Sequence, residues 1–228
     1  GETFQISGYS SQGSIESNDF GIYSVDTDFI SEGGSTTQQN IIQGEVVLNN
    51  NLPFSSLTGG VWIEGREQRS IIKTASGLLI EGTTGEAYFS LGASLWGVDI
   101  ITGGSSASST EASSVRINGI AGSTLDTFTW PDPNILGTSL LTSYGLSLDD
   151  TTINTSGSAY LSGGLEQSGG AIPVGVFASS ALFISNNSSV TAAKDIIISG
   201  NAGSREVGES GIVTGVYIES SEIRTLPQ

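Results

Sequence analysis

The chain has 228 residues, of which 36% are hydrophobic, 23 are acidic and 7 are basic, so its net charge is −16. It contains no histidine and no cysteine, which excludes Ser-His-Asp and Cys-His catalysis together with the usual zinc sites. The acidic balance disfavours nucleic acid and anionic membrane as partners, and no apolar run is long enough for a membrane-spanning helix.

A five-residue segment that ends in glycine recurs six times along the chain. Its copies start at residues 4, 40, 78, 115, 159 and 196, and they read FQISG, NIIQG, LLIEG, VRING, AYLSG and IIISG. The third residue of every copy is Ile or Leu, and the fourth is always polar. Because successive side chains of a strand point to opposite faces, each copy predicts a strand with one buried face. The closing glycine predicts either a turn with positive φ or a tightly packed backbone.

Two further segments follow within each period. A four-residue motif reads GIYS at 21, GVWI at 60, GVDI at 97, GLSL at 145, GVFA at 175 and GVYI at 215. A third segment reads SIIKT at 70–74, TTINT at 151–155, SSVTA at 188–192 and SEIRT at 221–225, whereas the first and third periods match it poorly. Each period therefore predicts two strands, and in most copies a third, joined by turns rich in Gly, Ser and Asn.

The repeat also predicts the fold class. The copies start 36 to 44 residues apart, and one such unit cannot bury its inner face alone, whereas stacked units share a continuous core. We therefore expect an all-β fold, a right-handed parallel β-helix of about six coils with a period of about 37 residues. A single domain would cover residues 1–228, with an enlarged loop at about 120–144. The apolar period of two excludes a helical repeat, and one wide or two narrow coils per period both fit.

The segments around DIIISGNAG and GVYIESSEIRT resemble the repeats of large secreted bacterial exoproteins of the filamentous-haemagglutinin-like type. The shared theme is a strand that ends in glycine, a variable loop, a Gly-Val-aromatic-aliphatic strand and a Ser-x-Ile-x-Thr strand. The resemblance implies a bacterial protein that is extracellular or on the cell surface. It also implies a structural or adhesive segment that forms a rigid rod. Only DPNILG at 132–137 comes near the export motif of such proteins, so we expect no export domain.

Aromatic residues provide the candidate binding residues. The third position of the four-residue motif is expected to face outward, and it is occupied by Tyr23, Trp62, Asp99, Ser147, Phe177 and Tyr217. Such a stripe of rings could stack on sugar rings, but packing of the rings against each other or under loops is the favoured interpretation. Phe128 and Trp130 in the enlarged loop form a second candidate contact site, with a cap over the core as the alternative.

The sequence gives little support for catalysis or metal binding. The candidate acids are Asp26 with Asp28 and Asp149 with Asp150. Adjacent residues in a strand point to opposite faces, and the spacing of these acids is not that of an acid–base pair. Lys73 and Arg224 occupy matching positions, but four coils separate them. We therefore expect no enzyme and no cofactor. Calcium is compatible with the charge, yet no calcium motif is present. The expected partners are further copies stacked head to tail, or neighbouring coils of a longer chain. A surface glycan is the alternative.

Overall fold

The computed structural model describes residues 3–11, 18–32, 39–47, 57–85, 87, 89–103, 113–122, 141–166, 177–202 and 211–227. Within these ranges the chain forms 18 strands and no α-helix, and the strands make three parallel sheets of six strands each. None of the described segments is a helix that could cross a membrane. The predicted parallel β-helix of six coils is confirmed.

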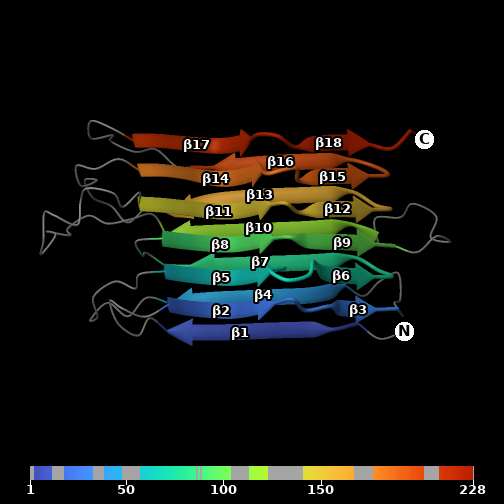
Figure 1. Ribbon diagram of the computed structural model, residues 1–228, viewed down its shortest axis with the longest axis horizontal. Helices are drawn as coiled ribbons and strands as arrows, with labels where there is room; N and C mark the ends of the chain where they lie inside the picture. Colours follow the sequence, from blue (N-terminus) through green and yellow to red (C-terminus); the bar gives the residue numbers. More distant parts are fainter. Residues whose placement is uncertain are drawn as a thin grey trace, which may run out of the picture.

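Each sheet takes one strand from every coil (Figure 1). Sheet A consists of β1 (Gln5–Ser11), β4 (Asn40–Val47), β7 (Leu78–Thr84), β10 (Val115–Gly122), β13 (Ala159–Glu166) and β16 (Ile196–Asn201). Sheet B consists of β2 (Asn18–Val25), β5 (Leu57–Glu64), β8 (Phe89–Trp96), β11 (Leu141–Asp149), β14 (Phe177–Ser185) and β17 (Gly211–Ile218). Sheet C consists of β3 (Phe29–Ser31), β6 (Ser70–Thr74), β9 (Val98–Thr102), β12 (Thr152–Thr155), β15 (Ser189–Ala192) and β18 (Glu222–Thr225).

One period of the sequence makes one wide coil. In Figure 1 the strands of sheet A run in one direction, and those of sheets B and C run back in the other, with the two chain ends at opposite ends of the stack. The third strand is present in every coil, including the first and third coils, where the sequence pattern was weak. The coil is therefore a flattened loop. The strands of sheet A contact those of sheet B, and β13 also contacts β15 of sheet C.

The pairing register confirms the predicted alternation in sheet A. The third position of the repeat pairs from coil to coil as one row that faces the core, and it consists of Ile6, Ile42, Ile80, Ile117, Leu161 and Ile198. The four members in the middle coils are at most 1% exposed. Each aliphatic side chain of the row stacks on those of the neighbouring coils and is thereby removed from water, so each coil stabilises the next.

The predicted alignment of the four-residue motif was wrong in two coils. GVDI at 97–100 belongs to sheet C, and its Gly97 is a corner residue with φ of 63° between sheets B and C. The sheet B counterpart of that coil is the segment 92–95. In the fifth coil the counterpart is the segment 181–184, in which Ala181 replaces the expected glycine. Gly-Val-x-Ile thus fits both a sheet B strand and a corner followed by a sheet C strand.

The glycine of each five-residue repeat is not a turn residue. None of these glycines has a positive φ, and the sheet A strand continues past every one of them. They form a row that faces sheet B, where a Cβ atom at Gly44, Gly82 or Gly119 would lie 1.9 Å from a carbonyl oxygen of the opposite backbone. The prediction of a tightly packed backbone is therefore right, and the alternative of a positive φ is wrong. Sheets A and B meet backbone to backbone along this row.

Two adjacent glycines in β13 provide a direct test of this contact. A Cβ at Gly163 would lie 1.7 Å from the Ala181 carbonyl oxygen, whereas a Cβ at Gly164 would have no atom closer than 3.7 Å. We predict that Gly163→Ala lowers the free energy of unfolding by at least about 3 kcal/mol, because the backbones must separate. Gly164→Ala should be neutral or slightly stabilising, since it reduces the entropy of the unfolded chain. Urea denaturation of both variants measures this, and equal effects would contradict the account.

Candidate functional site

The outer face of sheet B carries a row of aromatic side chains. The pairing register defines the outward row as Tyr23, Trp62, Ser94, Ser147, Phe183 and Tyr217. Of the six predicted positions, Tyr23, Trp62 and Tyr217 therefore do share one row, together with Ser147. Phe177 does not, because it pairs with Leu141 and Gly211 at the start of β14, and Phe183 occupies its expected place. Asp99 lies in sheet C.

The rings on this face pack against each other in two groups. In the first group the ring centroids of Phe20 and Tyr23 are 4.9 Å apart, and Trp62 meets both rings edge-on. In the second group Tyr144 stacks on Phe183 at 4.9 Å, and Phe183 stacks on Tyr217 at 5.4 Å. The two serines between the groups interrupt the outward row. Mutual packing of the rings, the favoured interpretation of the stripe, agrees with this geometry.

The sequence pattern missed part of this aromatic face. Phe20 and Tyr144 lie three residues before the outward row, a position that strict alternation would turn toward the core. Instead Phe20 stacks on Tyr23. The alternation changes phase at the intervening glycine, which the strand pairing skips in the same way in neighbouring coils, so both positions face outward. Phe128 and Trp130, the second predicted contact site, lie outside the described residues.

A buried carboxylate stands beside the first aromatic group. The side chain of Glu64 is 1% exposed. Its Oε1 accepts a hydrogen bond from the Tyr23 hydroxyl at 2.6 Å and forms an ion pair with Arg66 Nη2 at 2.5 Å. The hydrogen bond to Glu64 is the main cause that raises the pKa of Tyr23, with desolvation adding to it. Glu64 Oε2 and Trp62 Nε1 are buried without a hydrogen-bond partner in the described part of the chain. Buried polar atoms of this kind cost stability, so the cluster depends on its remaining bonds.

The acidic residues at the corners between sheets B and C have structural partners. Asp26 and Asp150 have positive φ values of 49° and 45°, which Asp tolerates better than most residues. Desolvation raises the pKa of Asp26, but bonds from the backbone N–H groups of residues 66–68 outweigh it, so the pKa lies below its usual value. Arg69 bonds Asp150 at 2.8 Å and Asp99 at 2.9 Å and so ties three coils together. No group of three or more potential metal ligands occurs among the described residues.

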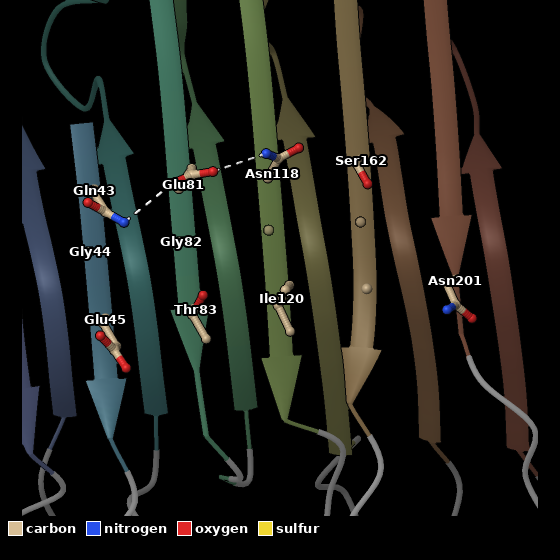
Figure 2. A pocket seen from close by; sticks show the side chains of 13 residues that line it. Gln43, Gly44, Glu45, Glu81, Gly82, Thr83, Asn118, Ile120, Ser162 and Asn201 are labelled. Carbon is tan, nitrogen blue, oxygen red and sulfur yellow. Dashed lines mark hydrogen bonds between the residues drawn. The ribbon is translucent and has the colours of Figure 1, made fainter. Parts of the chain in front are cut away.

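A polar groove lies on the outer face of sheet A (Figure 2). Its volume is about 480 Å³, and its floor is the backbone of the inward-facing glycine row, with Gly44, Gly82, Gly119 and Gly163 among the lining residues. Two outward rows form its walls. One wall contains Gln43, Glu81, Asn118 and Ser162, and the other contains Glu45, Thr83, Ile120 and Asn201. The groove therefore runs across the strands, along the axis of the stack.

One wall of the groove is joined by hydrogen bonds between coils. Gln43 Nε2 donates to Glu81 Oε2 at 3.3 Å, and Asn118 Nδ2 donates to Glu81 Oε1 at 3.3 Å, as the dashed lines in Figure 2 show. This row was predicted to be polar and outward, but its role as the wall of a groove was not predicted. The groove depends on how closely sheet A approaches sheet B, and that approach is a property of the folded stack.

We predict that Tyr23→Phe lowers the free energy of unfolding at neutral pH by about 1–3 kcal/mol, because the buried Glu64 carboxylate loses a donor. The pH dependence has a defined sign. A raised pKa means that the protonated phenol is favoured in the folded state, so its contribution is present below the ordinary tyrosine pKa of about 10 and is lost as the pH rises through the folded pKa. Wild-type protein should therefore lose more stability above about pH 10 than the variant. Urea denaturation of wild type and variant at neutral pH and above about pH 10 measures this.

The control for this experiment is Tyr160→Phe. The Tyr160 ring lies under the Arg116 guanidinium, 4.4 Å from its centroid, and phenylalanine keeps that ring. It should leave the stability at neutral pH nearly unchanged. Identical behaviour of the two variants would show that the Tyr23 hydroxyl does not support Glu64.

Comparison of the chain with protein families, with characterised proteins and with solved structures finds no match. The surfaces from which a function can be inferred are those of the coil stack itself: the aromatic face of sheet B, the polar groove of sheet A and the two end faces.

Proposed function

We propose that this chain is a structural segment of a secreted or cell-surface bacterial protein, a rigid stack of β-coils that is extended at its ends. The placement outside a bacterial cell depends on the resemblance of the repeats alone. The extension of the stack is supported by the end faces, and it can be tested with the purified chain.

The main support for extension is that the sixth coil exposes side chains whose counterparts in the fifth coil are buried in the core. Val216 and Ile218 pair with Leu182 and Ile184, which are fully buried in the fifth coil, yet the two sixth-coil residues are 38% and 42% exposed. Ile223 shows the same pattern in sheet C. Contiguous core-type side chains at a surface mark a contact site.

The backbone at both end faces is also ready for pairing. Among the described strands, β1, β2 and β3 at one end and β16, β17 and β18 at the other are edge strands of their sheets. Edge strands present N–H and C=O groups that can pair with a further strand. We propose that each end is completed by another coil of the same type, which a second copy supplies in a solution of this chain alone.

Head-to-tail stacking would continue the rows without a change of register. The first coil offers Ile6 to the row that ends at Ile198, and Tyr23 to the row that ends at Tyr217. Because the two faces differ, the contact is heterologous and does not close on itself, so the expected product is a filament. Backbone ladders and aliphatic rows would run through every interface, and this supports the proposed mechanical role.

We predict that wild-type protein assembles into rods whose length grows with concentration, and that Ile218→Asp blocks this assembly by placing a charge on the end face. The matched control is Ile101→Asp, because Ile101 is 38% exposed but lies on the outer side of sheet C. This control should assemble like wild type. Analytical ultracentrifugation and negative-stain electron microscopy over a concentration series measure the result. Wild-type monomers at every concentration, or equal assembly of both variants, would contradict the proposal.

A further inference from the structure

The groove on sheet A has the dimensions of a binding site for a linear ligand. Its lining residues extend from Gln43 in the second coil to Asn201 in the sixth, which is four strand spacings or about 19 Å along the stack. Its volume of about 480 Å³ lies within the range of known ligand sites, about 300–1,000 Å³. A ligand that fills it must be long and narrow and must lie across the strands.

The walls of the groove offer hydrogen-bonding groups that repeat with every coil. Gln43 and Asn118 each use one amide hydrogen on Glu81, and each amide retains a second hydrogen and a carbonyl oxygen. The bonds to Glu81 also hold the three side chains in one row, as Figure 2 shows, which lowers the cost of ordering them around a ligand. Thr83 and Ser162 add hydroxyl groups that both donate and accept.

This chemistry selects among ligand classes. A partner must donate and accept hydrogen bonds at each step along its length, as the hydroxyl groups of a sugar chain do. Among the described residues that line the groove, Glu45 and Glu81 are the only charged ones. Together with the chain's net charge of −16 they oppose an anionic ligand. Apart from these two residues the described wall residues are uncharged, so the walls offer few opposite charges to a cationic chain.

We propose that this groove binds a neutral, linear polysaccharide whose chain follows the axis of the stack. The groove extends the structural proposal to adhesion, but it does not depend on stacking, because its residues lie on the side of the coils. It is also separate from the aromatic face, which lies on sheet B. Extension of the stack would lengthen the groove along the same direction.

The test uses the full chain carrying Ile218→Asp, so that ligand binding is measured apart from assembly. The probes are hexasaccharides of β-1,4-linked glucose, mannose, xylose and N-acetylglucosamine, with hexagalacturonate and hexalysine as charged comparisons. Isothermal titration calorimetry should show that at least one neutral hexasaccharide binds, and that its trisaccharide binds about tenfold more weakly because it contacts fewer coils. The affinity should change little with salt, as expected for an uncharged ligand.

Two variants locate the site. Asn118→Trp and Thr83→Trp place a large ring in the groove from opposite walls, and each should weaken binding by about tenfold or more. Asn154→Trp makes the same change as the first variant on the outer side of sheet C, and it should leave the affinity unchanged. Circular dichroism confirms that each variant is folded.

Several results would overturn the proposal: no binding of any neutral hexasaccharide, binding of hexalysine or hexagalacturonate in preference, or equal affinity of the Asn118→Trp and Asn154→Trp proteins. Failure of stacking would show in ultracentrifugation without any sugar, so the two proposals are tested separately.

Discussion

The contact between two glycine rows is the constraint on which this structure depends. Sheet A contributes a glycine in all six coils, and in the middle coils a single added methyl group would overlap the backbone of sheet B. Sheet B faces this row with its own glycines. A Cβ on Gly60 or Gly92 would lie 2.3 Å from a backbone nitrogen of sheet A, although Ala181 takes the glycine position in the fifth coil and is fully buried. The coil can flatten only where sheet A has no side chain.

The same contact shapes the outer surfaces. Because the glycine row of sheet A has no side chains, only backbone lies between the two outward rows that flank it. This backbone is the floor of the polar groove. On sheet B the strands change phase at their own glycine row, so that Phe20 and Tyr144 join the outward aromatic face. The two faces differ in chemistry as a result. Rings on sheet B pack against each other, whereas the amides and carboxylates on sheet A line the groove.

The strength of the sheet A pattern explains how much could be predicted from the sequence. Its aliphatic, polar and glycine positions all repeat, so the period, the alternation and the number of coils could be recognised. The sheet B register was predictable only where glycine marked it, and it was lost where Gly97 formed a corner and where Ala181 replaced glycine. Phe177 was assigned to the aromatic row for that reason. The groove and the Glu64 cluster combine residues from different coils, and no local pattern of the chain indicates such combinations.

The contact of the glycine rows requires sheets A and B to lie at backbone contact distance. Nuclear Overhauser spectroscopy of protein labelled on valine methyl groups can measure this distance in solution. A Cβ placed on Gly44 would lie 3.0 Å from Cγ2 of Val61, and one on Gly200 would lie 2.9 Å from Cγ2 of Val216. We predict strong cross-peaks between the α-protons of both glycines and the methyl groups of these valines. Absence of the Gly44–Val61 cross-peak in folded protein would show that the sheets stand apart and would contradict the account.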